Sequence, residues 1–448
     1  MKWKPPDRLM STSGSKWKYQ ESQAILDELG KTLPFHFDNW KQKQTDKQSH
    51  PLYLIWSGPG TGKSRLLEEF SVLCTKSVKD KDLAARLSNA YIFKISFENG
   101  TRIQVSNDGN EVGTRMLFQL LGESKDWDKF AKNKENWKTP IEVITALAQG
   151  EGKKLEDMTV FILVDGIQEL SHKNRETNSM KSAINSVVQI VNMAPFFCIA
   201  AIAGTFYGNV ADVLSRSPQM RIYLTPPPLD GRAIIQSKDP LVQQLIDDMG
   251  GHGRALEALE QELQEVDITK CSASSFMNNI RASLERKYPP LQENAPRLVP
   301  ALIAVLIRYP LGKEDQIPNS DMTVDSIVQL GLFRHENRVL TCPFVFVWLL
   351  ATWSQHPTLA HFKLEAYDER QQKADPGLPV GLQCWQHWEE MTGQFRMLKS
   401  SLLKGKTIPI SELHAGALLG KEAQELKVKV TELEELLRAT GQYLIDGK

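Results

Sequence analysis

The stretch from Leu52 to Phe70, LYLIWSGPGTGKSRLLEEF, constrains the fold of this chain more than any other. It opens with five apolar residues, which is typical of a buried strand, and Leu66, Leu67 and Phe70 then fall on one face of a helix. Between them, SGPGTGKS lets backbone N–H groups converge on an anion at the start of that helix. The pattern predicts a strand, a phosphate-binding loop and a helix in an α/β protein with a parallel sheet.

The loop and the first helical turn supply the predicted nucleotide-binding residues. In this pattern Lys63 reaches the β- and γ-phosphates, and the Ser64 hydroxyl is a ligand of Mg²⁺. Ser57 stands where the eight-residue pattern usually has its first glycine. No residue distinguishes ATP from GTP. The full predicted set is Ser57, Gly58, Pro59, Gly60, Thr61, Gly62, Lys63, Ser64 and Arg65.

A second motif, VFILVDGIQE at 160–169, is an apolar strand that ends in an acid and has the form of a Walker B strand. We expect Asp165 to hold the Mg²⁺ directly or through water. Gly166 stands in the adjacent place, where many ATPases carry a water-activating glutamate. The nearest candidates for a base are Glu169 and, after it, Gln168. Glu169 could equally cap or solvate the following segment.

Further polar residues are candidates for sensing the nucleotide. Thr205 follows the apolar run 196–203 and could orient water, or it could be a turn hydroxyl. Arg216 or Arg221 could reach a nucleotide in cis or from a neighbouring subunit. Arg254, in GGHGRALE, begins a predicted lid helix and could sense the γ-phosphate. The alternative is a surface arginine at a helix N-terminus, where the helix dipole disfavours it.

A chain of 448 residues is long enough for about three domains. Its Pro- and Gly-rich breaks and its changes in composition predict five parts. A polar N-terminal leader or linker would be loosely ordered, with a helix near 23–29. In the core, we expect a strand at 91–97 near a sheet edge, helices at 111–121, 141–149 and 180–191, and a surface excursion at 122–139. The predicted parts are the leader (1–50), the phosphate-loop core (51–228), a helical lid (229–290), a winged-helix-like domain (291–356) and a helical C-terminal region (357–448).

The second half of the chain is predicted to be mostly helical. Helices at 323–330 and 344–353 around a hairpin at 332–342 predict a small winged helix. Its would-be recognition helix, TVDSIVQL, lacks Lys and Arg, so we expect packing and regulation rather than DNA reading. A last helix near 419–440 carries a heptad stripe that could form a dimer or pack on its own domain. The nuclease-like tripeptide Glu425-Leu426-Lys427 lies on this predicted helix, without the strand that such a site needs.

Composition limits the other classes of function. With 41% hydrophobic residues, 24% charged residues and zero formal net charge, the chain has no global field to hold nucleic acid or a membrane. Its apolar runs are too short to span a bilayer, and Met1–Met10 lacks the apolar core of a secretion signal. Five widely spaced cysteines predict free thiols in a reducing compartment. The sequence as given therefore predicts a soluble intracellular protein.

With these motifs in hand, the chain resembles P-loop NTPases of the AAA+ and STAND branch. The resemblance rests on SGPGTGKS, VFILVDGIQEL and GGHGRALE, and covers roughly residues 50–420. The second motif is similar to that of NACHT-type ATPases, except that Gln168 stands where they usually have Asp. The order of parts looks closest to Crinkler effectors and retrotransposon hot spot proteins. The resemblance implies a three-layer αβα core, ATP as the nucleotide, secretion, and action in a host nucleus.

Three hypotheses follow from the residues and the resemblance. The first is a Mg²⁺-dependent ATPase in which Lys63, Asp165, Glu169 and Arg254 are catalytic, with Ser64 and Asp165 as the metal ligands. The second is a nucleotide-gated protein-interaction switch with little turnover, which Gly166 and Gln168 favour. The third is the ATPase part of a DNA-directed effector whose nuclease is incomplete. The expected partners are a nucleoside triphosphate and other proteins or further copies of this chain. The charge does not support a nucleic-acid partner, and we expect no membrane partner.

Overall fold

The computed structural model describes residues 1–10, 12–98, 101, 110–121, 126–170, 178–205, 218–267, 273–356, 359, 399–400, 403–413, 420–422 and 426–430. The chain divides into two compact units, Met1–Gln236 with Gln329–Gly331, and Ser237–Val328 with Leu332–Lys448. The five-part division predicted from the sequence is not tested by these two units and stays a prediction.

Unit 1 is built on a five-stranded parallel sheet in the order β2-β3-β4-β1-β5. Strand β2 lies at an edge, as predicted. The strands are β1 (Leu52–Trp56), β2 (Tyr91–Ser96), β3 (Thr159–Asp165), β4 (Phe197–Gly204) and β5 (Arg221–Tyr223). Strands β3 and β4 are buried on both faces, which explains their uninterrupted apolar runs.

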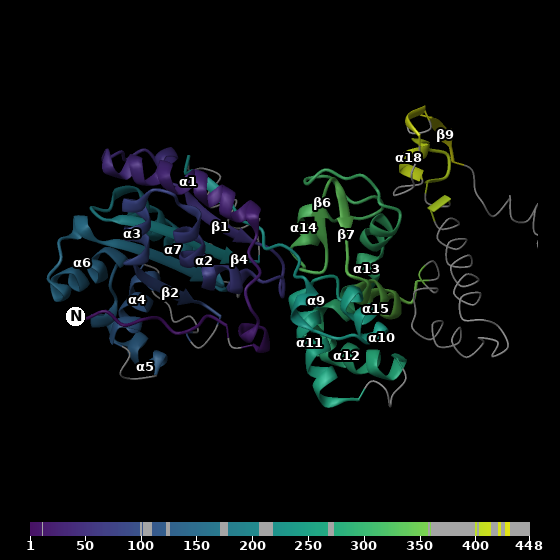
Figure 1. Ribbon diagram of the computed structural model, residues 1–448, viewed down its shortest axis with the longest axis horizontal. Coiled ribbons are helices and arrows are strands. Elements are labelled where there is room, and N and C mark those ends of the chain that lie inside the picture. Colours follow the sequence, from purple (N-terminus) through teal and green to yellow (C-terminus); the bar gives the residue numbers. More distant parts are fainter. Residues whose placement is uncertain are drawn as a thin grey trace, which may run out of the picture. The chain divides into compact units, whose positions relative to one another are not determined.

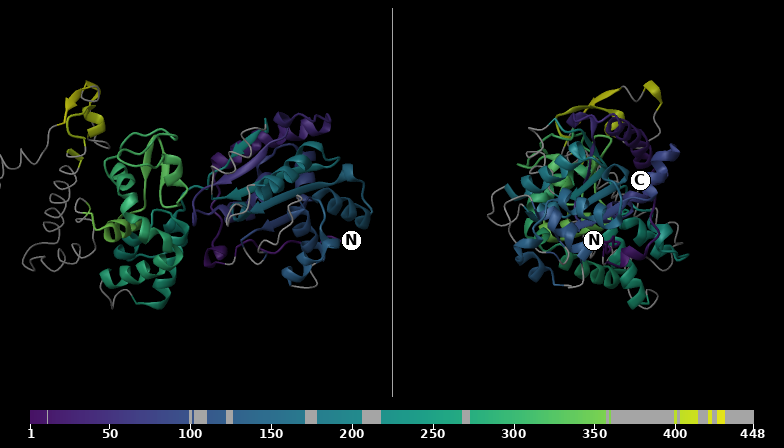
Figure 2. Two further views of the ribbon diagram at one scale, coloured as in Figure 1. Left: turned by 180° about the vertical axis from the view of Figure 1, so that it is seen from behind. Right: turned by 90° about the vertical axis from the view of Figure 1, so that its left-hand side faces the viewer.

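Helices cover both faces of this sheet and give three layers (Figure 1), seen from behind in Figure 2. Alternate strand residues such as Tyr53 and Phe161 pack on α1 (Gln23–Lys41), α2 (Lys63–Ser77) and α3 (Lys81–Ser88). The intervening residues, such as Leu54 and Ile162, pack on α4 (Glu111–Leu121), α6 (Pro140–Glu151) and α7 (Asn178–Met193). The predicted α/β fold with a P-loop NTPase core is confirmed.

The prediction of a loosely ordered leader is wrong. Helix α1 continues to Lys41 instead of ending near Leu29, and Leu29, Leu33 and Phe37 are buried against the sheet. These three residues repeat every four positions, so they form one apolar helix face. Pro34 lies inside the helix, and together with the polar flanks it hides the pattern in the sequence.

Short elements complete unit 1. The segment predicted as a surface excursion contains α5 (Trp127–Lys132), in which Trp127 is buried with its ring centroid 4.5 Å from the guanidinium carbon of Arg115. That part of the prediction is wrong. The others are η1 (Ser13–Lys16), η2 (Lys47–Ser49), η3 (Lys134–Asn136), η4 (Leu155–Asp157), η5 (Ile167–Leu170) and α9 (Gly231–Ile234).

Unit 2 begins with the predicted helix pair. Asp239 caps α10 (Pro240–Asp248) by accepting a hydrogen bond from the backbone N–H of Val242 at 3.2 Å, and Gly250-Gly251 ends the helix with both residues at positive φ. Helix α11 (Gly253–Glu265) follows, then α12 (Ala273–Lys287) and α13 (Pro289–Leu306).

The expected helix, hairpin and helix follow as α14 (Val324–Val328), β6 (Arg334–Glu336) paired with β7 (Val339–Thr341), and the buried α15 (Phe344–Ser354). Naming this arrangement a winged helix remains a prediction. Near the C-terminus, β8 (Thr407–Pro409) leads into α18 (Ile410–Leu413) and pairs with β9 (Lys427–Lys429).

The predicted helix over 419–440 is therefore wrong at 427–429, where the backbone hydrogen-bonds to β8 instead of to itself. Residues 431–440 of the expected heptad stripe, and Glu425 of the nuclease-like tripeptide, lie outside the described residues. Cys74, Cys198 and Cys342 are free thiols, as predicted. Among the helices of the described part of the chain, none has the length and apolarity that a membrane crossing requires.

Burial of α1 makes a testable claim about stability. Leu33 is 0% exposed, whereas Lys31 on the same helix is exposed. Leu33→Ala should lower the free energy of unfolding of unit 1 by about 2–5 kcal/mol, because it removes transfer energy and leaves a cavity. Urea titration followed by tryptophan fluorescence measures this, with Lys31→Ala as the matched control. Equal midpoints for the two variants would contradict the packing of α1.

Candidate phosphate-binding site

The glycine-rich loop lies between β1 and α2, at the carboxyl end of the sheet. Strand β1 lies between β4 and β5, inside the sheet, so the loop starts from a strand that is fixed on both sides. Gly62 precedes α2 with φ +97°, a left-handed conformation that glycine adopts without strain. Helix α2 therefore starts directly behind the loop and directs its N-terminal N–H groups at it, which suits an anion.

Lys63 lies over the loop. Its ammonium donates to the carbonyl oxygen of Gly58 at 2.7 Å, and the Thr61 hydroxyl donates to the same oxygen, also at 2.7 Å. Lys63 is only 9% exposed. A buried lysine that is held at a loop carbonyl keeps its charge within the loop, where a phosphate would meet it.

Asp165 and Ser64 meet although they come from distant parts of the sequence. The Ser64 hydroxyl in the first turn of α2 hydrogen-bonds the carboxylate of Asp165 at the end of β3. Burial raises the pKa of Asp165 to about 6, with a further rise from Glu98, while Ser64, Lys63 and the Gly166 backbone oppose it. The negative charge of Asp165 is therefore costly in the protein alone.

This pair suits a divalent cation. The Oδ2 atom of Asp165 is buried and has no hydrogen-bond partner among the described residues. A carboxylate oxygen and a serine hydroxyl are hard ligands that match Mg²⁺, which keeps waters and phosphate oxygens for its other positions. The part of the chain described contains no cluster of three or more His, Cys, Asp or Glu side chains arranged for a metal.

The side chain of Gln168 hydrogen-bonds to the segments that follow two neighbouring strands. The Gln168 amide nitrogen donates to the carboxylate of Glu98, and its amide oxygen accepts from the backbone N–H of Thr205 at 3.2 Å. Glu169 is half-buried on η5, and its N–H donates to the Gly166 carbonyl at 3.0 Å. The role of Glu169 as a base stays a prediction.

Glu98 is the residue that the motif analysis missed. It follows the carboxyl end of β2, next to the strand that carries Asp165. The signal in the sequence is an acid directly after an alternating strand, YIFKISFE. That signal is weak, because only the sheet order shows that this strand ends beside Asp165.

Two of the three arginines predicted to sense the nucleotide are described, and both have partners within the protein. Arg221 on β5 donates from Nε to the carbonyl of Gln219 at 3.3 Å, and Arg216 lies outside the described residues. Arg254 belongs to unit 2, at the start of α11. Its guanidinium lies 5.3 Å from the ring centroid of Tyr288 and hydrogen-bonds the Tyr288 hydroxyl. This partner stabilises an arginine that the helix dipole disfavours.

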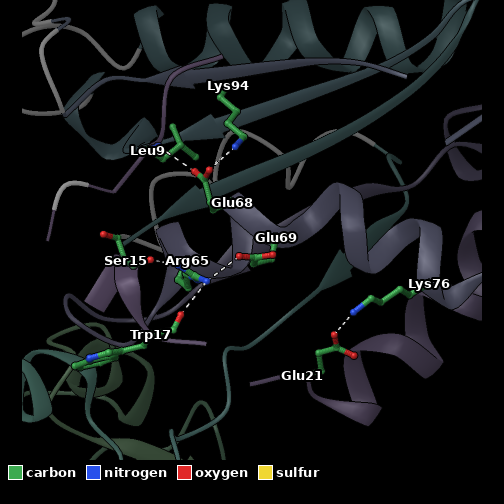
Figure 3. A network of polar contacts seen from close by, with 9 residues as sticks. All are labelled: Leu9, Ser15, Trp17, Glu21, Arg65, Glu68, Glu69, Lys76 and Lys94. Atoms are coloured by element: carbon green, nitrogen blue, oxygen red, sulfur yellow. Dashed lines mark hydrogen bonds and ion pairs between the residues drawn. The ribbon is translucent and has the colours of Figure 1, made fainter. Parts of the chain in front are cut away.

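Arg65 holds the N-terminal segment rather than the loop (Figure 3). Its guanidinium donates to the carbonyl oxygens of Ser15 at 2.8 Å and Trp17 at 3.2 Å, and pairs with Glu69 at 2.9 Å. A planar guanidinium satisfies such a set of acceptors well. We name residues 1–22 the N-terminal strap. The nucleotide-binding role predicted for Arg65 stays a prediction.

Arg65→Ala should release the strap. Charged hydrogen bonds of this kind contribute about 1.5–3 kcal/mol each, so local opening and tryptic cleavage after Lys16 and Lys18 should become faster. Limited proteolysis with mass spectrometry measures the rate. The control is Lys76→Ala, which removes an exposed ion pair with Glu21. Unchanged cleavage together with weaker nucleotide binding would assign Arg65 to the ligand instead.

Comparison with known proteins places the chain. No protein-family model matches it. It is 32% identical to Crinkler effector protein 108 of Phytophthora sojae in an alignment of 448 residues, which covers 94% of this chain and 53% of the relative. This chain thus spans about half the length of that relative.

Two solved structures are also similar to it. The Walker-type ATPase PABY2304 of Pyrococcus abyssi has 14% identity and a TM-score of 0.41 over 74% of this chain and 95% of the other. The ADP form of the ORC2 protein of Aeropyrum pernix has 11% identity and a TM-score of 0.39 over 76% and 96%. The chain is therefore similar to a Crinkler effector, as its motifs predict, and its own parallel sheet, with the glycine-rich loop between β1 and α2, has the predicted P-loop NTPase fold.

Proposed function

We propose that this protein binds MgATP at the loop 57–64 and hydrolyses it. The observation that carries the proposal is the meeting of Ser64 with Asp165, whose second carboxylate oxygen is buried without a hydrogen-bond partner among the described residues. Two segments that are distant in sequence supply hard ligands beside a glycine-rich loop and a buried lysine. This combination suits a metal-bound triphosphate better than a simple anion.

The loop, the start of α2 and the end of β3 bind different parts of MgATP. Backbone N–H groups at the start of α2 and the ammonium of Lys63 hold the phosphates, while Ser64 and Asp165 hold the cation. When bound, Mg²⁺ supplies positive charge to the β- and γ-phosphates. Lys63 has to leave the Gly58 carbonyl to reach a γ-phosphate, and it exchanges one oxygen acceptor for a charged one.

A second function, a nucleotide-gated switch with little turnover, is favoured by one observation, the absence of an acid at Gly166. In such a switch, exchange of the bound nucleotide, rather than its hydrolysis, changes which partners the protein contacts. Steady-state turnover separates the two functions, because both need tight MgATP binding and only the enzyme releases phosphate.

The remaining roles are also proposals. The similarity to a protein named as a Crinkler effector supports an effector role, secretion and action in a host nucleus. Arg254 as a sensor, the winged helix as a regulatory module, and assembly with other proteins or copies of itself are in keeping with an ATPase that changes shape. A DNA-directed role has the least support, since the formal net charge is zero.

Lys63→Ala should abolish tight MgATP binding. Loss of one charged contact to phosphate costs roughly 1.5–3 kcal/mol, about a tenfold to hundredfold rise in Kd. Isothermal titration calorimetry on the full chain measures this, with the exposed Lys79→Ala as control. Asp165→Asn should weaken binding only when Mg²⁺ is present. A wild-type chain without measurable MgATP affinity would refute the proposed function.

A further inference from the structure

Glu98 lies at the carboxyl end of β2, directly beside the end of β3. The β2–β3 pairing continues past Ser96, since the N–H of Phe97 donates to the Asp165 carbonyl at 3.0 Å. Glu98 comes next, and its own N–H donates to the Ser96 hydroxyl at 3.2 Å. The sheet therefore holds the backbone of Glu98. The Glu98 side chain is exposed, so water reaches its carboxylate.

Thr101 is also held by the core of unit 1. The Thr101 hydroxyl donates to the Ser96 carbonyl, and the Thr101 carbonyl accepts from the buried guanidinium of Arg115 at 3.0 Å. Arg115 in turn pairs with Glu111 and lies 4.3 Å from the ring centroid of Phe97.

The side chain of Glu98 fills the space that a side chain at position 166 would take. A Cβ placed on Gly166 would lie 2.5 Å from Cγ of Glu98, closer than such atoms approach, and 3.1 Å from Cδ, so the Glu98 side chain would have to move. Gly166 also has φ +73°, which favours glycine. The place in which many ATPases carry a glutamate after the metal-binding aspartate is therefore occupied by a glutamate from the neighbouring strand.

Gln168 fixes this carboxylate relative to two other strand ends. It is 5% exposed and donates to Glu98, while accepting from the backbone N–H of Thr205 after β4. One amide thereby joins the ends of β2, β3 and β4. The influence of Glu98 on the pKa of Asp165 agrees with the two carboxylates sharing one site.

We propose that Glu98 is the carboxylate that orients the attacking water and accepts its proton in ATP hydrolysis, and that Gln168 positions it. This inference rests on the proposed function. A lone pair of the water oxygen forms the bond to the γ-phosphorus, and the bond from that phosphorus to the bridging oxygen breaks. ADP leaves with the electron pair of the broken bond, and one water proton passes to Glu98.

Glu98→Gln tests the role directly, because it keeps the shape and removes the base. In the full chain, kcat for phosphate release should fall about 100-fold or more. The Kd for MgATP, measured by calorimetry, should stay within about threefold of wild type, since less than 1 kcal/mol of binding is lost. Glu135→Gln, which changes an exposed acid on η3, is the matched control and should keep wild-type turnover, while Glu169→Gln tests the rival base.

Gly166→Ala tests the geometry without touching an acid. Its new methyl group displaces Glu98, so kcat should fall at least about tenfold with little change in Kd. Gly152→Ala is the control, because Gly152 also has positive φ, at 65°, with nothing within 4 Å of an added Cβ. In the Glu98→Gln background, Gly166→Ala should cause no further loss of turnover, because the effects of two coupled residues are not additive.

Gln168→Met keeps the length of the side chain and removes the amide. Because Gln168 acts as a positioning residue, Gln168→Met should have a lower kcat than wild type, with the same KM and the same thermal midpoint of unfolding. A rise in KM with kcat unchanged would overturn its positioning role.

The outcomes for Glu98 are distinct. Wild-type turnover in Glu98→Gln, or loss of turnover in Glu169→Gln alone, overturns the proposal. Loss of MgATP binding in Glu98→Gln would make it a metal-site residue and also overturns the proposed role as base. A wild-type chain that binds MgATP tightly without hydrolysing it leaves the binding site intact and overturns the role of Glu98. Absence of binding overturns both proposals together.

Discussion

Parallel pairing of β1, β4, β3 and β2 is the constraint on which the site depends. The register places Trp56 opposite Gly204, Val164 opposite Ile202, and Ser96 opposite Asp165. Four strands therefore end almost level, and everything that follows them leaves the same edge of the sheet. Ligands bind outside the carboxyl ends of parallel strands for this reason. The loop, the metal-binding pair and Glu98 are brought together by backbone hydrogen bonds before any side chain contributes.

Packing then fixes the helix that presents the loop. Helix α2 packs on the sheet beside α1, and its outer residues hold the N-terminal strap (Figure 3). Glu68 accepts from the N–H of Leu9 at 3.0 Å and pairs with Lys94 on β2, so one carboxylate connects the strap, the helix and an edge strand. Half-buried pairs of this kind contribute more than exposed ones, because water screens them less. The polar start of the chain thus belongs to the structural support of the site.

The sequence predicts what is local and fails where the information lies in pairing. Strands β1, β3 and β4 are predictable because both faces are buried, and Asp165 is predictable because it ends one of them. The second half of helix α1 is missed because Pro34, a residue that usually ends a helix, lies within it. Strand β9 is missed because its partner β8 is about twenty residues earlier, and a helical repeat fits the same letters. Glu98 belongs to the same class of failure, since its neighbour in space, Gly166, is distant in sequence.

The two carboxylates of the site illustrate how one sheet gives similar groups different chemistry. Asp165 is 2% exposed, so its charge is poorly solvated, and a cation is the partner that offsets this cost. Glu98 is exposed and hydrogen-bonded to Gln168, so it keeps access to water. A cation at Asp165 would also reduce the repulsion between the two groups, because it neutralises the nearer charge. Gly166 is then no defect of the motif: a side chain there would collide with the carboxylate that β2 delivers to the same place.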